Sequence, residues 1–143
     1  MLYFLLRVQL QSMTSVFKNK VFARFARKAR ISDADLWKAV RLADDGAIDA
    51  DLGGGVIKQR IARAGQGKSG GSRSIILFRK GDRAVFAYGF EKKDRSNIGT
   101  DELEELRELA KVVLGYSPTM MQRMVAAGEF VAVETPKGES DGG

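Results

Sequence analysis

Two neighbouring segments, residues 74–78 and 84–90, are apolar at both odd and even positions. The pair Gly81-Asp82 lies between them, so the pattern predicts an antiparallel β-hairpin. Successive side chains of a strand point to opposite faces, and apolar residues at both parities therefore mean that both faces of this sheet are covered. Residues 56–62 are predicted to form a further strand. The apolar segment 74–78 is part of a predicted strand that extends over residues 72–79. The chain must pack helices on a sheet.

Helical patterns precede the predicted sheet. Apolar residues recur at helical spacing over residues 18–30, and a second helix begins at Ser32, caps with Asp35 three residues later and stops near Gly46. These two helices are predicted to form a hairpin.

Two more helices are predicted after the sheet. Asp101 with Glu104 in capping-box position begins one of them, and Ser117-Pro118 begins a shorter one as N-cap and first helical residue. A brief strand over residues 130–133 follows. The predicted fold class is α+β: a small antiparallel sheet with an N-terminal helical hairpin packed on it and C-terminal helices.

The length of 143 residues predicts one domain, and residues 13–134 hold all of the predicted elements. We expect residues 1–12, which precede Met13, to be an N-terminal extension, and residues 135–143 to be a flexible tail. The apolar run at the start is interrupted by Arg7 and is too short to span a bilayer. It also lacks the order of a signal peptide, so a cytoplasmic location is expected, with no membrane partner.

The charge of the chain is concentrated in the predicted sheet. Between Gly53 and Ile98 there are eleven Lys and Arg residues against three acids, and the whole chain has a net charge of +6 with no His and no Cys. A basic sheet face suits a polyanion such as nucleic acid. Any chemistry there would use Lys and Arg instead of imidazole, thiolate or a thiolate-held metal, so no metal and no small-molecule cofactor is expected.

Lys58 and Arg60 lie two residues apart on a predicted strand, which places them on one face with Cα atoms about 7 Å apart. Arg73 and Arg79 are expected to repeat this arrangement on the next strand. Tyr88, together with Phe90, is a candidate stacking platform, although an ordinary core position is the alternative for each. The remaining candidates follow the last strand or lie in the Gly/Ser-rich loop: Lys92, Lys93, Arg95 and Lys68.

The helix predicted over residues 18–30 carries six cations. A solvated helix face is the commoner explanation of such a pattern, and binding of a polyanion is the alternative.

Two motifs are set aside. Residues 65–69, GQGKS, resemble the end of a phosphate-binding loop, but the first glycine of that motif is replaced by Ala62 and the next predicted element is a strand instead of a helix. An acidic cluster over residues 44–51 matches no calcium-loop spacing and is typical of a turn that ends a helix.

Several short motifs in this order resemble the RelE superfamily of bacterial toxins, particularly its HigB-like branch. They are V-I-K-Q-R at residues 56–60, G-S-R at 71–73 and F-E-K-K-D-R-S-N-I at 90–98, after two helices. The resemblance covers residues 13–133. It implies a type II toxin silenced by a cognate protein antitoxin, and a metal-independent endoribonuclease that cuts mRNA on the ribosome and leaves a cyclic phosphate.

The resemblance also implies roles for individual residues. Lys58 is the candidate base toward the ribose 2′-hydroxyl, and Arg73 and Lys93 would hold the charge that develops on the phosphate, with Arg60 and Arg95 beside them. Some relatives carry a tyrosine just after the last motif, where this chain has Ile98. Two alternatives stay open: a gyrase-poisoning toxin of the ParE type, which shares the fold, and a nucleic-acid-binding regulator without catalytic activity.

Overall fold

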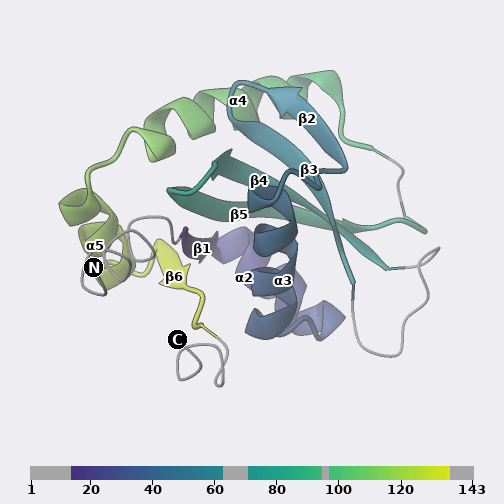
Figure 1. The fold of residues 1–143 in the computed structure, drawn as a ribbon, viewed down its shortest axis with the longest axis horizontal. Helices are drawn as coiled ribbons and strands as arrows, with labels where there is room; N and C mark the ends of the chain where they lie inside the picture. The colour runs from purple at the N-terminus through teal and green to yellow at the C-terminus, as the bar shows by residue number, and fades with distance from the viewer. Residues whose placement is uncertain (1–13, 63–70, 95–96, 136–143) are drawn as a thin grey trace, which may run out of the picture.

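The computed structural model describes residues 14–62, 71–94 and 97–135, and within them a six-stranded sheet is flanked by four helices (Figure 1). In chain order the elements are β1 (Ser15–Asn19), α2 (Lys20–Ala29), α3 (Asp33–Asp44), β2 (Ala50–Gly53), β3 (Val56–Ile61), β4 (Ser72–Arg79), β5 (Arg83–Glu91), α4 (Thr100–Leu114), α5 (Pro118–Ala126) and β6 (Phe130–Ala132). The strand order is β2-β3-β4-β5-β1-β6, antiparallel except for the β1–β5 pair. The predicted α+β class is confirmed. The proposed N-terminal extension and residues 136–143 of the proposed tail lie outside the described residues.

Helices cover both faces of the sheet, as the two-sided apolar pattern predicts. On one face, residues of α2 and α3 pack against Ile57, Ile76 and Phe86. On the other face, residues of α4 and α5 pack against Val56 and Leu77. The central strand β4 contributes buried side chains to both layers, and its residues from Ser72 to Leu77 are all buried.

The predicted helix caps are confirmed at two of three positions. The Ser32 hydroxyl accepts a hydrogen bond from the Asp35 N–H at 3.1 Å and the Asp35 carboxylate accepts one from the Ser32 N–H at 3.0 Å, while Ser117 Oγ caps α5. The prediction for α4 is wrong by two residues. Its carboxylate cap comes from Glu102, which accepts a hydrogen bond from the Gly99 N–H at 2.8 Å. None of the helices within the described residues is long and apolar enough to cross a bilayer.

The helix predicted over residues 18–30 begins only at Lys20, because the preceding residues form a strand. This strand, β1, pairs in parallel with β5 and antiparallel with β6. Its partners lie far away in the sequence, so a local pattern gives no signal for it. The short edge strand β2 was also not predicted.

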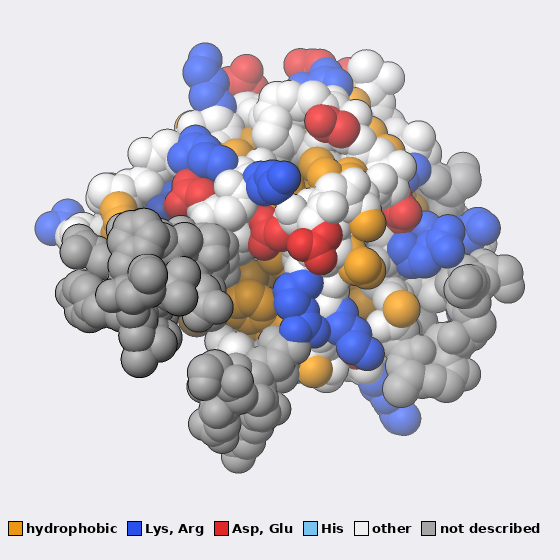
Figure 2. Space-filling view, viewed as in Figure 1, with side chains coloured by type: hydrophobic (Ala, Val, Ile, Leu, Met, Phe, Trp, Pro, Cys, Tyr) orange, Lys and Arg blue, Asp and Glu red, His pale blue; other side chains and the backbone are white. Residues whose placement is uncertain are grey.

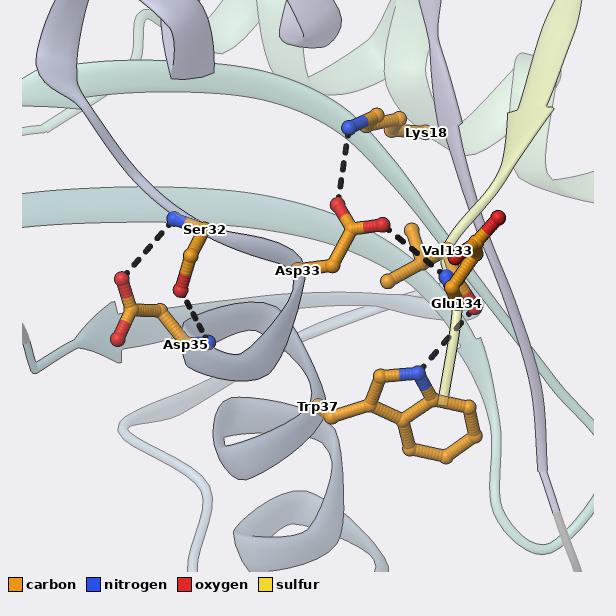
Figure 3. A network of polar contacts seen from close by, with 7 residues as sticks. All are labelled: Lys18, Ser32, Asp33, Asp35, Trp37, Val133 and Glu134. Atoms are coloured by element: carbon orange, nitrogen blue, oxygen red, sulfur yellow. Dashed lines mark hydrogen bonds and ion pairs between the residues drawn. The ribbon is translucent and has the colours of Figure 1, made fainter. Parts of the chain in front are cut away.

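A network of polar contacts joins α3 to β1 and to the chain that follows β6 (Figure 3). Asp33 accepts a hydrogen bond from Lys18 Nζ at 3.0 Å and another from the Glu134 N–H at 3.1 Å. One turn later, Trp37 Nε1 donates to the Val133 carbonyl at 3.2 Å. These contacts bring both ends of the described chain against α3.

The helix α2 lies directly on β5. Asn19 caps the helix by accepting a hydrogen bond from the Phe22 N–H at 2.8 Å, and its side-chain amide donates to the Ala87 carbonyl of β5 at 3.1 Å. One turn later the ring of Phe25 covers Gly89, where an added Cβ would lie 2.3 Å from Phe25 Cδ2. The close approach of α2 therefore depends on a glycine in the strand.

We predict that Gly89→Ala lowers the free energy of unfolding by about 1–3 kcal/mol, because the new methyl group overlaps the Phe25 ring. Urea denaturation of both proteins measures the change. The matched control is the same substitution in a Phe25→Ala background, where the methyl group has room and should cost much less. An equal cost in both backgrounds would show that packing against Phe25 is not the cause.

Candidate functional site

The cations of β3 and β4 meet at one end of the sheet. Arg60 is the cross-strand partner of Arg73, and Arg73 is in turn the partner of Phe90 on β5. The adjacent row runs from Lys58 through Ile75 to Tyr88. Neighbouring strands are about 4.8 Å apart and the two rows about 7 Å apart, so these residues occupy a compact area.

All of these side chains belong to the face that α4 covers. Lys58 and Arg60 share the parity of Val56, and Arg73 shares the parity of Ile75, and both apolar residues belong to the core layer beneath α4. That helix packs through Ala110 and Leu114 close to Gly55, at the opposite end of β3. The structure thus brings Lys58, Arg60 and Arg73 together on this face, toward the end of β3 away from Gly55.

A bulge in β5 decides which aromatic residues reach this face. The register with β4 shifts between Ile75 and Ile76, because Ile75 pairs with Tyr88 while Ile76 pairs with Phe86. The extra residue, Ala87, reverses the alternation of the strand. Tyr88 and Phe90 consequently face the cations, while Gly89 faces α2.

Arg73 is the deepest cation of the site, with 7% of its surface exposed. Within the described residues its side chain makes one hydrogen bond, a long one from Nη1 to the Ser72 carbonyl at 3.4 Å, and no acid pairs with it. A guanidinium has five N–H donors, and leaving a buried charged donor unsatisfied is costly. A bound anion would supply the missing acceptors and the opposite charge.

The other cations of this face are more accessible. Lys58 is half-buried and Arg60 exposed, and neither forms an ion pair within the described ranges. Lys92 and Lys93 are exposed in the turn after β5, which a hydrogen bond from the Lys92 N–H to the Gly71 carbonyl at 3.2 Å holds beside the start of β4. In Figure 2, basic side chains gather at the right of the molecule, toward which β4 and β5 extend in Figure 1. The candidates Arg95 and Lys68 lie outside the described residues.

Arg79 is not part of this group. It lies six residues beyond Arg73 at the far end of β4, about 20 Å away along the strand. There it pairs with Asp82 at 3.2 Å. The expectation that Arg73 and Arg79 form a close pair, like Lys58 and Arg60, is therefore wrong, since equal parity places two residues on one face without placing them near each other.

The aromatic candidates differ from each other. Phe90 is 4% exposed and belongs to the core, so the core alternative holds for it. Tyr88 is half-buried, with its ring centroid 6.3 Å from that of Phe90. A stacking role for Tyr88 stays a prediction.

Gln59, which lies between the two cations of β3, positions that strand. Its Nε2 donates to the carbonyls of Ala39 at 3.0 Å and Ala47 at 2.9 Å, while its Oε1 accepts a hydrogen bond from the Asp49 N–H at 3.0 Å. Sequence reasoning missed this residue. The available signal was a polar side chain at an inward-facing position between Ile57 and Ile61.

A hollow of about 740 Å³ lies on the other side of β3, against α3 and the α3–β2 connection. Arg60 lines it together with Lys38 and Arg41 of α3, and with Asp45 and Asp49. Strand β2 pairs with β3 only as far as Lys58, so the hollow lies beside the next residues of β3. Its charged lining continues the basic surface around this edge of the sheet.

Two charged residues outside the site have structural contacts. Asp44 of the acidic cluster accepts hydrogen bonds from Thr14 Oγ1 at 2.7 Å and the Gly81 N–H at 2.9 Å, which ties α3 to the β4–β5 turn. Arg83 donates from Nη1 to the carbonyls of Val113 at 2.9 Å and Tyr116 at 2.8 Å, at the end of α4. Burial lowers the pKa of Arg83. Within the described ranges no three acids gather as a metal site would require.

Fold and site together define a small basic α+β protein with a cationic sheet face suited to a phosphate backbone. Residues 14–133 match the family described as the RelE toxin of the RelE/RelB toxin–antitoxin system. Because this match covers most of the chain, the protein belongs to the RelE toxin family. Membership implies a toxin whose partner is an antitoxin. The search of curated proteins found no significant match.

We predict that Arg73→Met raises the melting temperature of the free protein, because it replaces a buried unpaired charge with an apolar side chain of similar length. The same change should remove most of the stabilisation that a polyanion confers. Thermal unfolding with and without heparin, at matched ionic strength, measures both effects, since a ligand at a hundred times its Kd stabilises by about 2.7 kcal/mol. The control is Arg79→Met at the far end of the same strand. Equal heparin effects in Arg73→Met and wild type would contradict anion binding at Arg73.

Proposed function

We propose that this protein is a metal-independent endoribonuclease toxin of the HigB-like branch, which cuts mRNA on the ribosome and is silenced by a cognate antitoxin. The observation that carries the proposal is the cross-strand pairing of Arg60 with the buried Arg73, which has no acid partner among the described residues, on the face that also carries Lys58. The RelE family match supports the ribonuclease class. The proposed branch rests on the motif resemblance alone.

The proposed reaction needs no group from outside the chain and the RNA. The ribose 2′-hydroxyl loses its proton to a base and its oxygen attacks the adjacent phosphorus, while the bond from phosphorus to the 5′-oxygen breaks. The products are a 2′,3′-cyclic phosphate and a 5′-hydroxyl, which takes up a proton. Negative charge increases on the non-bridging oxygens during this step, and fixed cations next to them lower the barrier.

The position of each cation suggests its role. Lys58 is the proposed base, because it lies one row from Arg73 on the same sheet face, and an amine can accept a proton. Arg73 would bind the phosphate through its free donors, with Arg60 on the neighbouring strand and Lys93 from the turn after β5. Arg95 completes the set by resemblance. Tyr88 and Lys92 would contact the flanking nucleotides.

We predict that Lys58→Ala and Lys58→Arg each lower the RNA cleavage rate about 10²–10⁴-fold, the usual contribution of a general base. Arginine keeps the positive charge but does not deprotonate in proteins, so Lys58→Arg should still bind RNA close to wild-type affinity. Single-turnover cleavage and binding of a 2′-O-methyl RNA separate the two effects. Full cleavage by Lys58→Arg would rule out Lys58 as the base.

The class of toxin is tested in cells. Inducible expression in a bacterium, with and without the neighbouring small reading frame, should give growth arrest that the neighbour relieves, and mapping of RNA ends should show new cuts within translated codons. Arg73→Ala should abolish the arrest. Arrest with intact mRNA and damaged DNA would favour a gyrase poison, and arrest that survives both Lys58→Ala and Arg73→Ala would exclude the proposed site.

A further inference from the structure

The outer face of α2 carries a line of cations that the proposed reaction does not use. Lys20, Arg24, Arg27 and Lys28 are all exposed, on the side of the helix opposite the buried Phe22. We define these four residues as the α2 stripe. In the described parts of the chain, its one ion pair joins Lys20 to Glu129 at 3.6 Å, between two exposed side chains.

The α2 stripe works against the stability of its own helix. Lys20 and Arg24, and also Arg24 and Lys28, are like charges four residues apart, a spacing that destabilises a helix. Lys20 is the first residue of the helix, so its charge lies at the positive end of the helix dipole, which is unfavourable. The first turn contains no acid that would offset this repulsion. The dipole favours Arg27 and Lys28 near the C-terminus, but it does not explain the other two.

The α2 stripe and the candidate site lie on opposite sides of the sheet, and the C-terminal half of β5 runs between them. The pairing of β1 with β5 ends at Phe86, and among the described residues no strand pairs with the C-terminal half of β5 on that side. Phe25 places α2 over Gly89 at this edge, while Tyr88 and Phe90 face the cations of the sheet. The turn with Lys92 and Lys93 follows directly.

We propose that the α2 stripe is a second RNA-binding surface, which holds the phosphate backbone of the RNA where it passes around the edge of β5. This inference rests on the proposed function and adds a docking surface to it. A polyanion would relieve the repulsion between the four cations, and their spread along the helix, about 12 Å from Lys20 to Lys28, suits an extended phosphate chain. The stripe would contribute to affinity and not to the bond-breaking step.

The test is the salt dependence of RNA binding. The triple variant Arg24→Gln/Arg27→Gln/Lys28→Gln should bind a fluorescent 2′-O-methyl RNA with a slope of log K against log salt that is less steep by about 2, since each single-strand phosphate contact contributes about 0.7. At 0.1 M salt the affinity should fall up to about 100-fold. The matched control, Lys80→Gln/Lys111→Gln/Arg123→Gln, removes the same charge from exposed positions elsewhere and should keep the wild-type slope.

The outcomes separate this inference from the proposed function. An unchanged slope, or an equal change in the control, would overturn the inference even if the wild type cuts RNA. A less steep slope in the triple variant, together with a wild type that cuts no mRNA either free or on ribosomes, would support the stripe and refute the nuclease. Loss of antitoxin binding with an unchanged RNA slope would assign the stripe to the protein partner and overturn the inference.

Two further readouts guard against misfolding. The triple variant should melt at or above the wild-type temperature, because it removes like-charge pairs, and Arg24→Gln alone should change the slope by about 0.7. At saturating protein, single-turnover cleavage of ribosome-bound mRNA should proceed at the wild-type rate in the triple variant, because the stripe contributes only to affinity. A rate loss there would contradict a purely docking role.

Discussion

Burial of β4 and β5 on both faces is the constraint on which the rest of this structure depends. Ile75 and Leu77 pack beneath α4, and Ile76 packs on the opposite layer, so neither face of the sheet centre can hold charge. Cations on the strands can therefore lie only toward the ends of those strands. Lys58, Arg60 and Arg73 lie at one such end, and Arg73 already sits at the margin of the core. The same packing that stabilises the fold thus confines the charged face to a small area.

The cationic features lower the stability of the free protein. Arg73 is buried with no acid partner in the described part of the chain, and the α2 stripe places like charges four residues apart on one helix. Both arrangements become favourable when an anion binds, because binding to the native state alone stabilises it. In the proposed function, the binding of RNA, or of an antitoxin that covers the same surface, would therefore raise the free energy of unfolding.

Much of the fold could be predicted from local signals. The strands β3, β4 and β5 and the helix α3 have strong periodicity, turn residues and a capping box, all of which act over a few residues. By contrast, β1 and β2 are short and lie where they do because distant segments pair with them. The start of α4 was misplaced because two pairs have capping-box spacing, Asp101 with Glu104 and Gly99 with Glu102, and only the backbone geometry chooses the second.

The sequence by itself determined the α+β class, the two covered sheet faces and the cationic, histidine-free composition of the candidate site, since composition and periodicity carry that information. Only the tertiary structure decided which cations meet. Register pairs Arg60 with Arg73 and sends Arg79 to the far end, and a single bulged residue in β5 aims Tyr88 at the cations and Gly89 at α2. Register and bulges depend on the energy of whole paired strands, which no short stretch of sequence contains.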